Sequence, residues 1–170
     1  MYERLGFARI GERTLEDADR SREYGFWRRL RPGALAGATQ CALCRIAAGE
    51  LKADRIVETA RIVAFVNDIE PLSRGHSVFF PRRHAPTLHD ADDGDLAEIM
   101  AAITNVARAM ELEHYNVLQN NGARAGQTVF HVHVHLIPKW ADTDGLAVDH
   151  RAAGYIDQRD ISRRLRERLR

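Results

Sequence analysis

The sequence is poor in cysteine, has no long apolar run, and carries charges that nearly cancel. Its 170 residues include two cysteines and five prolines, and the formal net charge is +1. No stretch approaches the roughly 20 apolar residues that a membrane-spanning helix needs, so we expect no membrane segment. A protein that binds nucleic acid through its phosphates usually has a marked basic excess, which is missing here. An anionic ligand must therefore be bound by local geometry.

The cysteines and the amino terminus bear on the compartment. The first residues contain no apolar core followed by a small-residue cleavage site, so we do not expect a signal peptide. Cys41 and Cys44 form one Cys-x-x-Cys, where a disulfide would close a tiny loop and stabilise little. These features predict a cytoplasmic protein whose two thiols are available to a metal.

The length fits one domain with a core of its own, and 45% apolar and 29% charged residues are typical of a globular protein. Residues 1–40 are charged and mixed, which predicts an N-terminal extension with one helix near Thr14–Leu30. We expect the domain itself over residues 41–140. Residues 141–170 form a C-terminal segment that ends in a basic helix, Ile161–Arg170.

The pattern of the central region predicts strands around one long helix. Apolar residues recur at helical spacing between Leu96 and Met110, after three aspartates at the end where the helix dipole favours anions, so we expect a helix over Asp92–His114. A short helix is expected over Cys44–Glu50. Short apolar runs predict five strands: Asp54–Glu58, Arg61–Val66, Ser77–Pro81, Tyr115–Gln119 and Val129–Pro138. These elements predict an α+β fold with a mainly antiparallel sheet.

The last of these strands contains three histidines at alternate positions, His131, His133 and His135. Alternation predicts that they share one face, about 7 Å apart, with apolar residues on the other face. One histidine in a strand is most often packing or surface, but a buried row of three needs partners for every ring nitrogen. The spacing is too wide for all three to hold one metal ion with bonds of about 2.1 Å. This favours an anion as the ligand.

The turn before the histidines has the features of a phosphate site. Glycines such as Gly126 let backbone N–H groups approach an anion, and Gln127 and Thr128 can donate side-chain hydrogen bonds. A glycine turn alone is more often a simple connection. Its position directly ahead of the histidine row raises its significance.

Two motifs in this order resemble the histidine-triad (HIT) family. The first is Asn-x-Gly-x-x-x-Gly-Gln-x-Val-x-His-x-His-x-His-x-Ile-Pro at 120–138, and the second is the upstream run from Asp68 to His84. The likeness covers about residues 41–140. It implies an α+β domain that forms a two-fold homodimer and binds a purine nucleotide, with an adenosine or guanosine monophosphate moiety. The helix Asp92–His114 and the strand Tyr115–Gln119 would lie nearest the dimer axis.

The resemblance also assigns roles by position. His133 matches the family's nucleophile, and His135 matches the histidine that helps bind the phosphate and the leaving group. Asp68 matches the acid that holds the ribose hydroxyls. The phosphate-side contacts match Asn120, Gly126, Gln127 and Thr128. Attack at the α-phosphorus would give a nucleotidyl-histidine that water then splits, and no catalytic metal is required.

Some members of the family hold zinc with a Cys-x-x-Cys pair and two histidines. These match Cys41 and Cys44 together with His84 and His131, and such a closed site would be structural. The alternative is that both thiols are half-buried core residues. A thioredoxin-like redox motif is less favoured because no βαβ pattern follows. The other histidines are expected to be structural or on the surface: His76, His89, His114 and His150.

Three classes of function remain open. The first is a hydrolase of purine nucleoside phosphoramidates, adenylates or dinucleoside polyphosphates. The second is a nucleotidyltransferase or phosphorylase that uses the same intermediate, although the family's transferases usually carry glutamine at the position of His135. The third is a non-catalytic regulator that binds nucleotide or zinc. We interpret the arginine-rich tail as a solvated helix face and do not expect it to bind nucleic acid.

Overall fold

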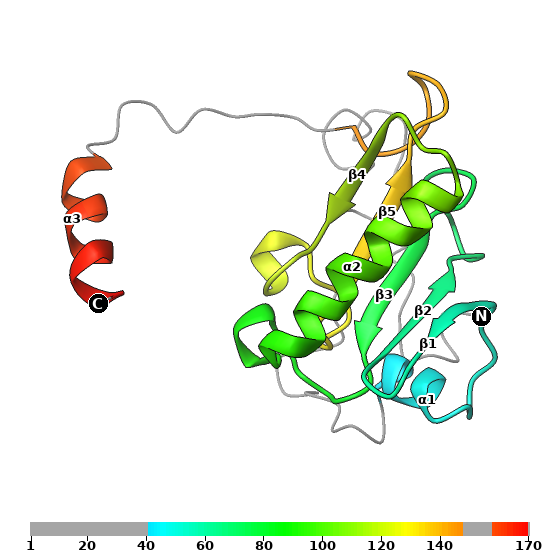
Figure 1. Cartoon of the computed structure of the whole chain (residues 1–170), viewed down its shortest axis with the longest axis horizontal. Coiled ribbons are helices and arrows are strands. Elements are labelled where there is room, and N and C mark those ends of the chain that lie inside the picture. Colours follow the sequence, from blue (N-terminus) through cyan, green and yellow to red (C-terminus); the bar gives the residue numbers. More distant parts are fainter. Residues whose placement is uncertain (1–40, 148–157, 170) are drawn as a thin grey trace, which may run out of the picture.

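One antiparallel sheet organises the computed structural model, which describes residues 41–147 and 158–169. Five strands pair in the order β1-β2-β3-β5-β4, as Figure 1 shows. This confirms the predicted α+β fold, and the observed bounds differ by a residue or two for most strands. The strands are β1 (Arg55–Glu58), β2 (Ile62–Val66), β3 (Ser77–Pro81), β4 (Tyr115–Leu118) and β5 (Val134–Pro138).

The central strands are buried on both faces. All five residues of β3 are buried, and Phe79 and Phe80 point to opposite faces, each fully enclosed. Phe79 packs with the residues that meet the long helix α2 (Asp93–Ala109), whereas Phe80 packs with the residues around the short helix α1 (Ala42–Ala47). One face of the sheet is therefore covered by α2, and α1 covers one end of the other face.

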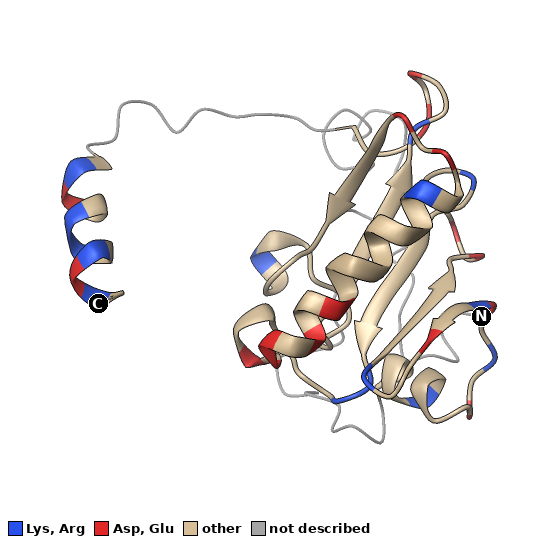
Figure 2. Cartoon of the chain, in the orientation of Figure 1, with Lys and Arg blue, Asp and Glu red and all other residues tan. Residues whose placement is uncertain are grey.

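Helix α2 (Asp93–Ala109) lies across the sheet in Figure 1. Asp92 caps its first turn by accepting a hydrogen bond from Gly94 N at 2.9 Å, and the ribbon at this end is coloured red for acidic residues in Figure 2. Its buried residues include Ile99 and Ile103, but Met100, which the apolar stripe includes, is 50% exposed. The apolar stripe is therefore wider than the buried face.

The predicted end of this helix at His114 is wrong. The last helical residue is Ala109, and Glu111 adopts the left-handed conformation with φ 54°. Leu112 N donates to Ala107 O at 3.1 Å and Glu111 N donates to Arg108 O at 3.0 Å, which is the Schellman pattern of a helix end. Glycine usually occupies the left-handed position, so a glutamate there gives no stop signal in the sequence.

The short helix α1 (Ala42–Ala47) begins and ends earlier than the predicted Cys44–Glu50. Cys41 is its N-cap residue, and Gly49 takes the left-handed φ of 81° just after its end. Both cysteines therefore belong to the first turn of one helix. Leu43 and Ile46 fix that helix by packing against the face of the sheet that carries Phe80.

Among the residues that the structure describes, the remaining helices are η3 (Leu88–Asp90), η4 (Ala123–Ala125) and α3 (Gln158–Arg168), which is exposed and rich in arginine. Among residues 41–147 and 158–169, no helix is long and apolar enough to cross a bilayer. The predicted N-terminal helix and His150 lie outside the described residues.

Candidate functional site

The histidine segment is a strand only in its second half. We predicted one strand over Val129–Pro138, but β5 begins at Val134. The chain departs from the sheet because Val132 N donates to Ala85 O at 2.6 Å, beyond the end of β3. Two consecutive buried residues, His131 and Val132, break the predicted alternation. The prediction that the three histidines share one face of a strand is therefore wrong.

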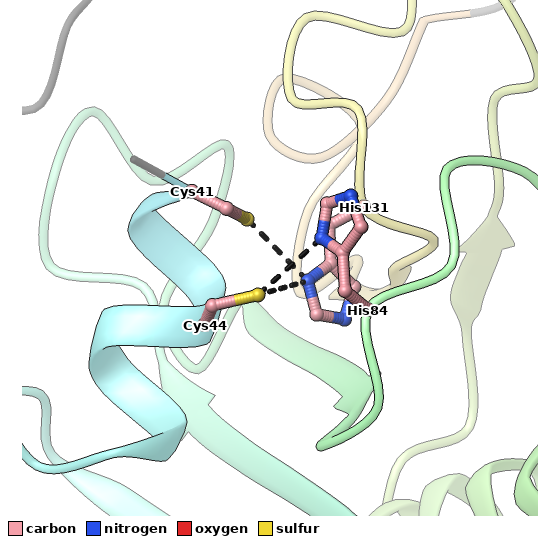
Figure 3. Close-up of side chains that lie close together, drawn as sticks. All are labelled: Cys41, Cys44, His84 and His131. Carbon is pink, nitrogen blue, oxygen red and sulfur yellow. Dashed lines mark hydrogen bonds between the residues drawn. The ribbon is translucent and has the colours of Figure 1, made fainter. Parts of the chain in front are cut away.

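His131 turns away from the other two histidines and joins the cysteines. Figure 3 shows the sulfur atoms of Cys41 and Cys44 facing the rings of His84 and His131. One ligand atom from each of the four residues lies within 4.8 Å of the other three. His131 Nδ1 is 3.4 Å from each sulfur, and His84 Nδ1 is 3.3 Å from Cys44 Sγ.

These distances fit a zinc ion. Bonds of about 2.3 Å to sulfur and about 2.1 Å to nitrogen, at tetrahedral angles, separate the two ligand atoms by about 3.6 Å. His131 Nε2 lies 2.8 Å from Pro81 O and donates to it, so the lone pair of its neutral ring is on Nδ1, which faces the sulfur atoms. The four side chains thus supply the donor set and orientation of a closed structural site.

Two arginines hold the helix that carries the cysteines. Arg55 donates to Ile46 O, and Arg82 Nη1 donates to Ala47 O at 2.9 Å, so both guanidinium groups cap the C-terminal carbonyls of α1. Glu58 in β1 pairs with both arginines, at 2.8 Å from Arg55 and 2.5 Å from Arg82. These contacts fix α1 to the β1–β2 hairpin.

Burial sets the protonation of the cluster. It raises the pKa of the Cys44 thiol to about 12, with a further contribution from the neighbouring Cys41. Burial also lowers the pKa of His131 to about 4. Both histidine ligands are needed neutral and both thiols deprotonated for metal binding, and a divalent cation supplies the charge that favours the thiolates.

His133 and His135 form a second group with a histidine that the sequence analysis assigned to structure or surface. Their rings meet edge to face with centroids 5.0 Å apart. His76 Nε2 lies 2.9 Å from His135 Nδ1. Only 4% of the His76 surface is exposed. His76 thus extends the pair to three neighbouring rings, of which His76 and His135 are hydrogen-bonded.

The hydrogen-bond partners fix the tautomers of these rings. Leu72 N donates to His76 Nδ1 at 3.2 Å, and since a backbone N–H cannot accept, the proton of a neutral His76 is on Nε2. His76 therefore donates to His135 Nδ1, which leaves the proton of His135 on Nε2. His133 carries its proton on the other nitrogen from His135. Its Nδ1 donates to His131 O at 2.7 Å, and its Nε2 keeps the lone pair.

Burial keeps the rings neutral near pH 7. It lowers the pKa of His76 to about 4, and it lowers the pKa of His133. The pKa of His135 is also lowered by burial, then by the charges that His133 and His76 would carry. An uncharged pair with one bare nitrogen and one N–H suits a nucleophile beside a proton donor.

The turn before the histidines is organised by Gln127, which is 3% exposed. Its Oε1 accepts from Gly122 N at 2.7 Å, and its Nε2 donates to Pro86 O at 2.6 Å and to Val129 O at 3.1 Å. Both amide protons are used within the chain. The expectation that this side chain donates to a phosphate is therefore corrected: Gln127 shapes the turn.

The other predicted contact residues lie nearer the surface. Thr128 is exposed and Asn120 is half-buried at the two ends of the turn, and Gly126 takes the left-handed φ of 83° within it. Asp68 is exposed in the loop that leads to His76. This loop folds back on itself, because Asn67 N donates to His76 O at 2.8 Å. The Asp68 carboxylate is therefore exposed, at the start of the loop that carries His76.

Comparison with known proteins finds a family model and relatives that match most of the described region. A family model described as the HIT domain matches residues 48–142. An adenosine 5'-monophosphoramidase of Schizosaccharomyces pombe is 43% identical over 108 residues, covering 64% of this chain and 80% of the relative. Another, of Saccharomyces cerevisiae, is 44% identical over 108 residues, covering 64% of this chain and 68% of the relative.

Solved structures of proteins named as histidine triad proteins have the same fold. A histidine triad nucleotide-binding protein from Candida albicans superimposes with a TM-score of 0.69 at 34% identity, covering 76% of this chain and 96% of the other. A zinc-bound histidine triad family protein from Mycobacterium smegmatis gives a TM-score of 0.59 at 31% identity, covering 78% of this chain and 95% of the other.

Proposed function

The chain belongs to the histidine-triad (HIT) family, and from that premise we propose that it is a nucleotide-binding hydrolase that cleaves at an α-phosphorus. Its substrates are purine nucleoside phosphoramidates, adenylates or dinucleoside polyphosphates. The yeast relatives named adenosine 5'-monophosphoramidases support this class. The observation that carries the proposal is the opposite polarity of two adjacent rings, with a bare nitrogen on His133 and an N–H on His135.

In the first step, His133 Nε2 attacks the α-phosphorus. A nitrogen–phosphorus bond forms while the bond from phosphorus to the leaving group breaks. The bond from His133 Nδ1 to His131 O stays in place and stabilises the positive charge that develops on the ring. His135 Nε2–H donates a hydrogen bond to the departing atom and keeps its proton, while His76 stays bonded to the other nitrogen of that ring. The departing atom takes its proton from water.

In the second step, water attacks the nucleotidyl-histidine. The phosphorus–nitrogen bond breaks, the nucleoside monophosphate is released, and His133 returns to its starting form. His135 Nε2–H again donates to the reacting oxygen, and the water that protonated the leaving group supplies the hydroxyl, so protons balance over the two steps. Catalysis thus uses the same two rings in both halves of the reaction.

The nucleotide is held by residues on both sides of the histidines. We assign the ribose hydroxyls to Asp68, whose exposed carboxylate can accept two hydrogen bonds. The phosphate is assigned to the turn of Asn120, Gly126 and Thr128, with His133 and His135, while Gln127 keeps that turn in shape. Zinc held by Cys41, Cys44, His84 and His131 supplies structural stability, because all four protein ligands close the coordination sphere.

A substrate panel tests the function. Purified protein is incubated with adenosine monophosphoramidate, lysyl-adenylate and diadenosine polyphosphates, with and without inorganic phosphate, and the products are separated by chromatography. We expect adenosine monophosphate from at least one substrate at a rate independent of phosphate. A nucleoside diphosphate formed only with phosphate would identify a phosphorylase instead, and no turnover of any substrate would contradict the proposal.

We also propose that the chain forms a two-fold homodimer through the surface around α2 and β4. β4 is an edge strand, and Tyr115 and Val117 point to the same face as α2, because Val117 lies opposite Leu136 of the core. Tyr115 is 44%, Val117 43% and Met100 50% exposed. Exposed apolar side chains beside an open strand edge favour association with a second copy.

Light scattering at micromolar concentration should return about twice the mass of one 19.2 kDa chain. Replacing Val117 by aspartate should shift the protein toward the monomer, because the new charge would be buried in the interface. A wild-type protein that is a clean monomer and still turns over substrate would contradict the homodimer and show that each site is built within one chain.

A further inference from the structure

The segment that follows β5 is hydrogen-bonded to the loop whose contacts with His76 determine which nitrogen of His135 carries the proton. Trp140 Nε1 donates to Arg74 O at 2.8 Å, and Gly145 N donates to Leu72 O at 3.0 Å. Leu72 is the residue whose own N–H donates to His76 Nδ1. Two bonds from residues 139–145 therefore fall on the short stretch 72–76.

Hydrogen bonds within residues 139–145 stabilise this segment. The Asp144 carboxylate accepts from Ala141 N at 2.9 Å and from Trp140 N at 3.1 Å. Lys139 Nζ donates to the carbonyls of Asp142 at 3.1 Å and Asp144 at 3.0 Å. Gly145 takes a φ of 80°, and a Cβ there would approach Pro138 O to 3.2 Å. The segment is a compact turn that continues directly from β5.

The position of this turn connects the two ends of the histidine chain. β5 carries His135, and the turn that follows β5 holds the loop that carries Leu72 and His76. Without that hold, the exposed Leu72 can move away from His76 Nδ1. The longer contact of Asn67 Nδ2 at 3.4 Å then remains, and since an amide can turn to present its oxygen, a neutral His76 can carry its proton on either nitrogen. With the proton on Nδ1, His76 Nε2 accepts from His135 Nδ1–H, and His135 no longer presents an N–H on Nε2.

We propose that Trp140 is a positioning residue for the hydrogen bond to the leaving group: its indole N–H holds the 72–76 loop so that Leu72 N–H and His76 keep the proton of His135 on Nε2. This rests on the proposed function. The half-exposed Trp140 ring bonds to a backbone carbonyl, so it acts through the loop and not on the substrate.

The test compares two leaving groups in the Trp140→Phe variant. Adenosine monophosphoramidate loses ammonia, whose departing nitrogen needs a hydrogen-bond donor, whereas the 4-nitrophenyl ester of adenosine monophosphate loses a stable anion that needs none. We expect kcat/KM for the phosphoramidate to fall by about tenfold or more, and that for the ester to stay within about twofold. A protein carrying benzothienylalanine at position 140, which keeps the ring shape and lacks the N–H, should behave like the phenylalanine variant.

An equal loss for both substrates, or no loss for either, would overturn the proposal. Nitrogen-15 spectra of the histidine rings provide a reading that does not depend on turnover. The wild-type protein should show His135 protonated at Nε2 alone, and the Trp140→Phe variant should show both tautomers. If the wild-type protein turned over neither substrate, the proposed function would fail, while the spectra would still decide the role of Trp140.

Discussion

Replacing His133 by alanine is expected to reduce turnover by about 10⁴-fold or more while leaving the binding of adenosine monophosphate intact. The variant loses the ring nitrogen to which the proposed mechanism assigns the covalent bond, and removal of a nucleophile commonly costs several orders of magnitude. The pocket that binds the nucleotide keeps its turn and loop, since those are held by Gln127 and His76 through bonds that do not involve His133. Single-turnover kinetics and calorimetric titration with the monophosphate measure the two quantities.

His89→Ala is the matched control, because His89 is exposed in η3 and bonds only to Thr87 among the described residues. Its turnover should equal that of the wild-type protein. When the wild-type reaction is quenched with denaturant at alkaline pH, where a nitrogen–phosphorus bond to histidine survives, mass analysis should find the nucleotide on the peptide that contains His133. Near-normal turnover of His133→Ala would exclude the covalent mechanism.

Purification without chelator should yield about one zinc per chain, and replacing Cys44 by serine should remove it and lower the melting temperature. A ligand that binds only the native state adds about 4 kcal/mol when its free concentration is about 1,000 times Kd. For a domain of this size that corresponds to a decrease of roughly 10 °C in melting temperature. Elemental analysis and calorimetry measure the two effects.

The comparison in excess chelator separates metal loss from packing. Cys44 is partly exposed and differs from serine by one atom, so without metal the two proteins should melt within about 2 °C of each other. The difference should reappear when zinc is added back to the wild-type protein. A wild-type protein that contains no zinc, or a Cys44→Ser variant that retains it, would contradict the assignment of the site.

The elements of the fold were predictable because their signals are local. The apolar pattern of β3 is continuous, and the stripe of α2 follows helical spacing, so both were assigned from sequence with correct type. The errors lie where the backbone changes direction without a glycine or proline to mark the change. Glu111 ends α2 in a conformation usually taken by glycine, and His131 and Val132 draw the chain away from the sheet before β5.

The candidate site divides in the same way. The types and the order of its residues are written in the sequence, so the resemblance could pick out His133, His135 and the zinc ligands by position. The role of His76 could not be read there, although it directly precedes β3. Its side chain meets His135 because β3 and β5 pair with Val78 opposite His135, and the pairing of strands distant in the chain has no local signal.

The sequence by itself determined which groups are present: two thiols, a row of histidines, and glycines where the backbone must turn. Only the tertiary structure decided which of these groups lie together. His131 lies with the two cysteines, and His76 is hydrogen-bonded to His135. It also decided where the protons lie, since a ring nitrogen donates or accepts according to the partner facing it. Those partners are the N–H of Leu72 and the carbonyls of Pro81 and His131. They are backbone groups, which do not depend on the side chain, so the sequence carries no signal of them.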